Sequence, residues 1–192
     1  MHPMKAIDPQ MLAGQVAWVT ASARGLGRAM VERLARCGAS VVLHSRSDRT
    51  PAEFDEAPST THVAAELEQL GVPVLTVFAD LNDPAAVDDA VKQIHDRFGR
   101  LDILVNNAGG DIAAAGGKPK NNDAVHIAME DVDAVLDRNL RTTILCCRAA
   151  VPAMIEQAAG RIVNIGSIDG HYGIPERAIY ASSKAGQAHY TR

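Results

Sequence analysis

"QVAWVTASARGLGRAMVERLARCG", residues 15–38, joins an apolar run, a turn of small residues and a helical pattern without a break. The apolar run at 15–20 predicts a short buried strand, and the spacing of Met30, Leu34 and Cys37 predicts a helix after the turn. A turn of this kind points backbone N–H groups at a phosphate, helped by the helix dipole. The stretch therefore predicts a nucleotide-binding turn or, on this motif alone, a plain strand–helix connection.

Strand and helix patterns keep alternating along the rest of the chain. Strands are predicted at 40–45, 72–80, 101–110 and 160–167, helices at 62–71, 83–99, about 130–157 and from Tyr180 onward, and polar loops at 46–61 and 110–123. This alternation predicts right-handed βαβ units and a parallel sheet covered on both faces. We therefore expect one domain over residues 1–192 with an α/β, Rossmann-like doubly wound fold. Since this fold usually has six strands, the five predicted here imply a sheet that is incomplete at its C-terminal edge.

The composition limits the class of protein. Hydrophobic residues make up 47% of the chain and aromatic residues only 4%, so aliphatic side chains must form the core. A net charge of −4 argues against binding to nucleic acid or a membrane surface, and no apolar run approaches the ~18 residues of a bilayer span. Residues 1–14 have no signal-peptide pattern. Three cysteines without metal-like spacing predict free thiols, no metal site and a cytoplasmic protein; a redox pair at Cys146 and Cys147 is the weaker alternative.

The glycines of the turn have a physical use. Gly25 and Gly27 let the backbone and a ligand approach each other closely. The spacing differs from GxGxxG, because Ala21 and Ala23 stand where glycines are expected. The turn by itself therefore leaves both interpretations open.

The end of the second predicted strand bears on the choice of nucleotide. About 20 residues after Gly25, where an NAD-binding protein places an acidic residue for the ribose 2′-hydroxyl, this chain has Ser45 and Arg46. Together with Arg24 in the turn, Arg46 suits a 2′-phosphate, because guanidinium groups bind phosphate in a bidentate manner. Asp48 weakens this inference, and solvated loop arginines are the alternative. The residues thus favour NADP(H) over NAD(H).

The fourth predicted strand runs into "NNAGG", which begins at Asn106. Its two asparagines fall where the carboxyl end of a strand meets the ligand crevice of an open α/β sheet. An asparagine at this place can hold a cofactor or tie neighbouring strands together, and Ala108 and Gly109 leave room beside it. The alternative is an ordinary turn.

Near the end of the chain, Tyr180 and Lys184 lie four residues apart in "YASSK", and Ser167 follows the fifth predicted strand. On a helix this spacing brings both side chains to one face. A phenol is a poor base at neutral pH, but a nearby ammonium lowers its pKa. Such a tyrosine could exchange a proton with a carbonyl/alcohol pair while a hydride moves to or from a nicotinamide cofactor. Without other motifs, the pair would be a solvated helix face.

"TASARGLG", "NNAG", a serine thirteen residues before the tyrosine and "YASSK" occur together in this order. With this set, the chain resembles the short-chain dehydrogenase/reductase family, and "GRIVNIGSIDGHYG" is most similar to its 3-oxoacyl-(acyl-carrier-protein) reductase-like branch. The resemblance implies an NADP(H)-dependent oxidoreductase that interconverts a ketone and a secondary alcohol, and a homodimer or homotetramer. It implies the catalytic residues Asn139, Ser167, Tyr180 and Lys184. It implies the cofactor-binding residues Thr20, Ser22, Arg24, Gly25, Leu26, Gly27, Ser45, Arg46, Asp80, Leu81, Asn107, Ala108, Gly109, Tyr180 and Lys184, with Asn106 as the first asparagine of its motif.

The implied roles are specific. Ser167 would stabilise the substrate oxygen and Tyr180 would act as general acid/base. Lys184 would lower the tyrosine pKa and bond the nicotinamide ribose. Asn139 would hold a water in a proton relay, and Asp80 would contact adenine.

The chain departs from the family pattern in its glycine turn and in its length. The family motif begins Thr-Gly, whereas Thr20 is followed here by Ala21, which is the costlier residue if φ is positive. The family also continues through another helix–strand–helix–strand with a loop that closes over the substrate. We therefore expect the 192-residue chain to be much less active than a longer version.

Two other classes of function stay open on the sequence. One is a catalytically incompetent fragment that binds a nucleotide or serves as an oligomerisation module. The other is an epimerase or dehydratase of the extended branch, which the NNAG motif and the glycine spacing disfavour. The substrate and the direction of reaction are not determined by the sequence.

Overall fold

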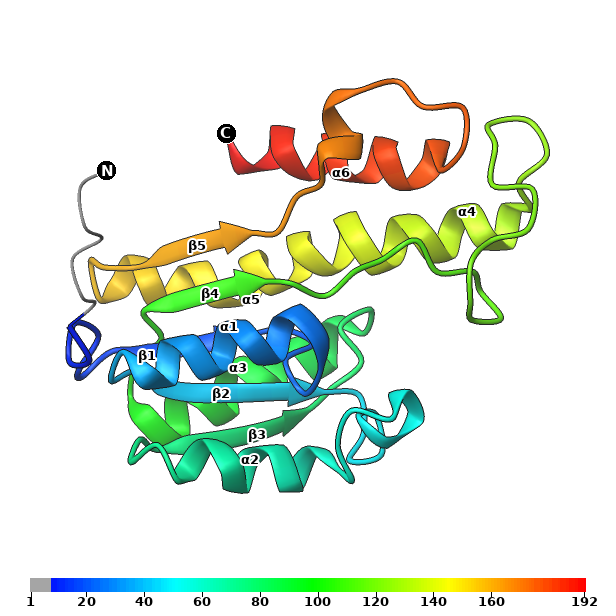
Figure 1. The fold of residues 1–192 in the computed structure, drawn as a ribbon. Helices are drawn as coiled ribbons and strands as arrows, with labels where there is room; N and C mark the ends of the chain where they lie inside the picture. The colour runs from blue at the N-terminus through cyan, green and yellow to red at the C-terminus, as the bar shows by residue number, and fades with distance from the viewer. Residues whose placement is uncertain (1–7) are drawn as a thin grey trace, which may run out of the picture.

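The structure, a computed structural model, describes residues 8–192; residues 1–7, part of the stretch considered for a signal peptide, lie outside that range. One parallel sheet contains β1 (Val16–Val19), β2 (Ser40–Ser45), β3 (Val74–Phe78), β4 (Ile103–Asn106) and β5 (Arg161–Asn164). The strand order is β3-β2-β1-β4-β5 (Figure 1). The predicted Rossmann-like fold is confirmed. The order reverses between β1 and β4, and open α/β sheets bind ligands in the crevice beyond the carboxyl ends of the strands at such a reversal.

The helices alternate with the strands as expected. They are α1 (Gly25–Arg36), α2 (Thr60–Glu68), α3 (Pro84–Phe98), α4 (Met129–Leu136), α5 (Thr142–Glu156) and α6 (Ala178–Thr191). Short 3₁₀ turns occur at η1 (Ala52–Phe54) and η3 (Ile168–His171). The N-cap of α3 is Asp83, as its position before a proline predicts, and its carboxylate accepts a bond from the amide of Ala85 at 2.9 Å.

Alternate strand residues point to opposite faces of the sheet and form two cores. On one face, Val19 of β1 packs with Val31 of α1 and Val63 of α2. On the other face, Trp18 of β1 packs with Ile94 of α3 and with α5. Both faces are therefore covered by helices (Figure 1), and aliphatic side chains supply most of the burial, as the composition requires.

The prediction of one helix over about 130–157 is wrong in one respect, because the helix is not continuous. A π-helical segment, η2 (Asp137–Arg141), separates α4 from α5. Neither glycine nor proline occurs between residues 129 and 151 to mark this change in the sequence. Segments of this type are frequent at functional sites, and this one carries Asn139.

The three cysteines match the prediction of free thiols. Cys37, Cys146 and Cys147 are free and buried. Desolvation raises the pKa of the Cys146 and Cys147 thiols, so both are poor nucleophiles at neutral pH. In the described range, no helix combines the length and the apolar character needed to cross a bilayer.

Candidate active site

The turn after β1 is tied to the turn after β4. The Thr20 hydroxyl accepts bonds from the amides of Asn107 and Ala108, both at 2.9 Å, and donates to the carbonyl of Val105 at 3.3 Å. The Asn107 side chain donates back to the carbonyls of Thr20 at 3.0 Å and Ala21 at 3.2 Å. Both side chains therefore shape the crevice by holding its two walls together. An asparagine here was expected either to hold a cofactor or to tie neighbouring strands together. The bonds of Asn107 show the second use, since they tie the ends of β1 and β4 together.

The glycine turn has the geometry of a phosphate cradle. Ala21 has φ +51° and Gly25 φ +55°, so the first position does need a positive φ and alanine is strained there by about 1 kcal/mol. A Cβ on Gly27 would lie 2.2 Å from the carbonyl oxygen of Ala21, so only glycine fits. Within the described chain, the amides of Leu26 and Gly27 have no protein acceptor, as expected at a helix N-terminus. These features fit the pyrophosphate of a dinucleotide.

His44 of β2 braces the same turn from the side. Its Nδ1 accepts the amide of Ala21 at 2.9 Å, and its Nε2 lies 3.2 Å from the carbonyl of Ala79. Its own amide donates to the Ser22 hydroxyl at 2.9 Å, and its carbonyl accepts the amide of Ser22 at 2.9 Å. An Nδ1 that accepts requires the neutral ring. Burial lowers the pKa of His44 from 6.5 to about 4, opposed by its bond to Ala79 and by the charge of Asp80.

This brace makes the stability of the fold depend on pH. Between pH 6.5 and 4 the unfolded chain binds a proton at His44 that the folded chain excludes, so stability is lost as the pH falls, by up to about 3 kcal/mol. We expect urea unfolding of wild type to show about 2 kcal/mol lower stability at pH 5 than at pH 7. In His44→Asn this decrease should be much smaller, whereas His189→Asn, at an exposed histidine, should keep it. An equal decrease in His44→Asn would contradict the assignment.

The residues expected around the adenosine differ in their accessibility. Arg46 is exposed, but Ser45 is buried and its hydroxyl donates to the carbonyl of Ser47 at 2.9 Å. Asp80 is exposed just after β3, and Leu81 beside it is buried. Arg46 and Asp80 are therefore accessible to a ligand, whereas the buried Ser45 hydroxyl is already bonded to the protein.

Asn106 is a strand tie in this structure. It is 3% exposed, and its side-chain amide donates to Oδ1 of Asn164 on β5 at 2.8 Å and to Sγ of Cys147 on α5 at 3.3 Å. Its side chain therefore points into the sheet and its covering helix. Gly109, three residues on, has φ +153°, and a Cβ there would lie 2.5 Å from Oδ1 of Asn139. The space beside Gly109 is therefore occupied by the side chain of Asn139.

Lys184 is the buried cation of the site. Its side chain lies on α6, is 4% exposed, and donates to the carbonyl of Ile165 at 2.7 Å and to Oε1 of Gln187 at 3.1 Å. Desolvation lowers the pKa of Lys184 to about 8, so the ammonium form still prevails at neutral pH. Its Nζ lies 5.9 Å from the centre of the Tyr180 ring. The structure thus brings the predicted tyrosine and lysine to one face of α6.

A chain of hydrogen bonds links Lys184 to Asn139. Gln187, 1% exposed, donates from Nε2 to Oγ1 of Thr143 at 2.7 Å. That hydroxyl donates in turn to the main-chain carbonyl of Asn139 at 2.9 Å. The Asn139 side chain is committed to the backbone, because it exchanges two bonds of 2.9 Å with Gly110. Sequence reasoning missed Gln187 and Thr143; the signal was a polar residue three positions after Lys184 on a helix that must bury one face.

Ser167 begins the short turn η3, which packs against α6. Its hydroxyl caps η3 by accepting the amide of Asp169 at 3.2 Å. A Cβ on Gly170 would lie 2.9 Å from the amide nitrogen of Ala185, so η3 and α6 are in direct backbone contact. The turn that Ser167 caps therefore packs against α6 beside Lys184 and Ala185.

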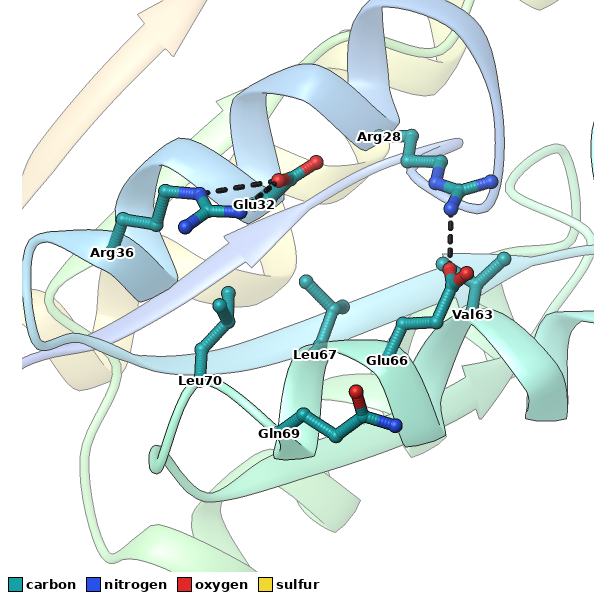
Figure 2. Close-up of a pocket in the computed structure, with 8 residues that line it drawn as sticks. All are labelled: Arg28, Glu32, Arg36, Val63, Glu66, Leu67, Gln69 and Leu70. Carbon is teal, nitrogen blue, oxygen red and sulfur yellow. Dashed lines mark hydrogen bonds and ion pairs between the residues drawn. The ribbon is translucent and has the colours of Figure 1, made fainter.

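A second concave region lies between α1 and α2 (Figure 2). Its charges are already paired, Arg28 with Glu66 and Arg36 with Glu32 at 2.7 Å. It borders the β3 side of the sheet, whereas α6 contacts β5 at the other edge (Figure 1). None of the predicted catalytic side chains reaches it, so the crevice at β1 and β4 is the candidate site.

Comparison with known proteins identifies the family of the chain. The family model described as "short chain dehydrogenase" matches residues 15–192. A cyclohexanol dehydrogenase of Rhodococcus sp. (strain TK6) is 39% identical over 96% of this chain and 69% of its own length. A 3-oxoacyl-[acyl-carrier-protein] reductase of Synechocystis sp. is 35% identical over 94% of this chain and 67% of its own. A metagenomic short-chain oxidoreductase solved with NADP superimposes with a TM-score of 0.79 at 31% identity, covering 94% of this chain and 74% of that chain.

The chain belongs to the short-chain dehydrogenase family, and so to the oxidoreductases that act on CH–OH groups. Its relatives include 3-oxoacyl-acyl-carrier-protein reductases, as the sequence indicated. The chain spans about two thirds of the length of the curated relatives that it matches.

Proposed function

We propose that this protein is an NADP(H)-dependent oxidoreductase that interconverts a ketone and a secondary alcohol, with Tyr180 as general acid/base. The observation that carries the proposal is the buried ammonium of Lys184, whose Nζ is 5.9 Å from the Tyr180 ring centre on the same helix. A cation held there stabilises the negative charge that develops on the phenol oxygen as its proton is transferred. When bound, the nicotinamide cofactor supplies or accepts the hydride.

The protein groups around Tyr180 have separate tasks. In reduction, the Tyr180 hydroxyl gives its proton to the carbonyl oxygen, and the Ser167 hydroxyl donates a hydrogen bond to the same oxygen. Lys184 stabilises the phenolate that remains and bonds the nicotinamide ribose. Asn139 holds a water of a proton relay, from which a proton returns to the site. Gln187 orients Lys184 through its side-chain oxygen.

The cofactor assignment rests on the turn after β1 and on the ends of the strands. The amides at the start of α1 bind the pyrophosphate, and Arg24 and Arg46 bind the 2′-phosphate of NADP(H). Asp80 contacts the adenine. The remaining cofactor-binding assignments are Thr20, Ser22, Gly25, Leu26, Gly27, Ser45, Leu81, Asn107, Ala108, Gly109, Tyr180 and Lys184; Thr20, Ser22, Ser45 and Asn107 act by shaping the backbone.

The substrate is a small carbonyl or alcohol compound, and the protein acts in the cytoplasm as a homodimer or homotetramer. The names of the relatives, a cyclohexanol dehydrogenase and a 3-oxoacyl reductase, support a ketone/alcohol pair.

The test titrates NADPH and NADH against the 192-residue chain and then follows NADPH oxidation with cyclohexanone and with a 3-oxoacyl thioester. We expect NADPH to bind at least about tenfold tighter than NADH, a gap that one charge-assisted phosphate contact can supply. Turnover with either carbonyl compound supports the proposed reaction. Tighter binding of NADH contradicts the cofactor assignment, and binding without turnover favours a nucleotide-binding module.

A further inference from the structure

The loop between β2 and α2 folds back over the start of α1. One oxygen of the Glu56 carboxylate accepts the amide of Gly25 at 2.6 Å, and the other lies 3.8 Å from the guanidinium of Arg24. The Arg24 guanidinium also lies over the ring of Phe54, 3.5 Å from its centre. Arg28 donates to the Glu56 carbonyl at 3.4 Å. In Figure 1 this loop, with its short helix, stands beside the carboxyl ends of β2 and β3.

The loop is also fastened at its own ends. Asp48 accepts bonds from the amide and the hydroxyl of Thr61, both at 2.8 Å. The hydroxyl of Thr60 donates to the carbonyl of Ser47 at 3.1 Å. Since both ends are bonded to each other, the residues between them form a closed segment rather than an open connection. This holds Glu56 and Phe54 over Arg24.

The carboxylate of Glu56 therefore sits where negative charge of a nucleotide is expected. A helix N-terminus with a guanidinium beside it attracts an anion, and here the protein supplies one itself. For Arg24, the carboxylate at 3.8 Å offsets part of the positive charge that would otherwise be free for a phosphate. A ribose diol placed there can donate hydrogen bonds to a carboxylate, whereas a 2′-phosphate is repelled by it.

From this we infer that Glu56, a residue of the loop between β2 and α2, limits the preference of the site for NADP(H) over NAD(H) by competing with the 2′-phosphate for Arg24. The inference deepens the proposed function and rests on its nucleotide site. It places the specificity-determining acid in the loop, eleven positions beyond Ser45, which ends β2. Arg46, which is exposed after β2, remains available to the phosphate.

The test measures dissociation constants of NADPH and NADH for wild type, Glu56→Gln and Glu53→Gln, the last as a charge-matched control in the same loop. Glu56→Gln should tighten NADPH binding about tenfold and change NADH binding less than threefold. Glu53→Gln should change both less than twofold. In an Arg24→Gln background the gain from Glu56→Gln should disappear, because its cause is release of Arg24.

Each other outcome has a distinct meaning. Equal tightening of both nucleotides, no change, weaker NADPH binding, or a gain that persists without Arg24 would overturn the inference. A wild type that prefers NADH, combined with a selective gain for NADPH in Glu56→Gln, would overturn the proposed cofactor preference and support the inference. Failure of wild type to bind either nucleotide would overturn both.

Discussion

Tyr180→Phe is expected to lower kcat for ketone reduction about 10³-fold. The phenol oxygen is the only atom removed, and a general acid contributes about 10²–10⁴ to rate. Among residues 8–192, no protein group is hydrogen-bonded to this hydroxyl, so its loss leaves no partner unpaired. The free energy of unfolding should therefore stay within about 0.5 kcal/mol of wild type. Stopped-flow turnover and urea unfolding provide the two measurements.

Tyr190→Phe is the matched control, because Tyr190 lies on the same helix and is 43% exposed. It should keep kcat within about twofold of wild type. Retention of wild-type kcat by Tyr180→Phe would remove the tyrosine from the mechanism. A large loss of stability in Tyr180→Phe would instead assign it a structural role.

Gly27→Ala is expected to destabilise the fold by about 3 kcal/mol and to weaken nucleotide binding at least about 100-fold. The added Cβ would lie 2.2 Å from the carbonyl oxygen of Ala21 and 2.6 Å from Nδ2 of Asn107. The first of these contacts is with backbone, so it cannot be relieved by rotating a side chain. The turn would have to move, and the amides that face the phosphate would move with it. Calorimetric titration with NADPH and urea unfolding measure the two effects.

The control for this change is Gly173→Ala. An added Cβ on Gly173 meets nothing within 4 Å, and the residue has no positive φ. Its substitution should leave stability within about 0.5 kcal/mol and nucleotide binding unchanged. If Gly27→Ala behaved in the same way, the cradle described for the turn would be wrong.

Most of the fold follows from local patterns that the sequence displays directly. The strand predicted at 40–45 is observed at Ser40–Ser45, and the one at 15–20 at Val16–Val19, because short apolar runs between turns leave few alternatives. The N-cap of α3 is likewise readable from Asp83 followed by proline. The helix boundary at Thr60, two residues before the predicted start, depends on the cap formed by Ser59.

Other parts of the site could not be found this way. The interruption of the long helix at Asp137–Arg141 has no local marker, because neither glycine nor proline occurs in or near it. Gln187 looks like an ordinary helix residue until its burial beside Lys184 is known. Glu56 lies in a polar stretch without periodicity, and nothing local connects it with Gly25, 31 positions away.

The sequence by itself determined the order of strands and helices, the glycine turn and the Tyr180–Lys184 pair, because each depends on spacings of a few residues. Only the tertiary structure decided which polar groups are engaged with one another. One example is the contact of His44 with Ala21, and another is the contact of Glu56 with Arg24. In each, the two residues lie far apart in the sequence. Their partners are set by sheet order and loop path, which no short spacing encodes.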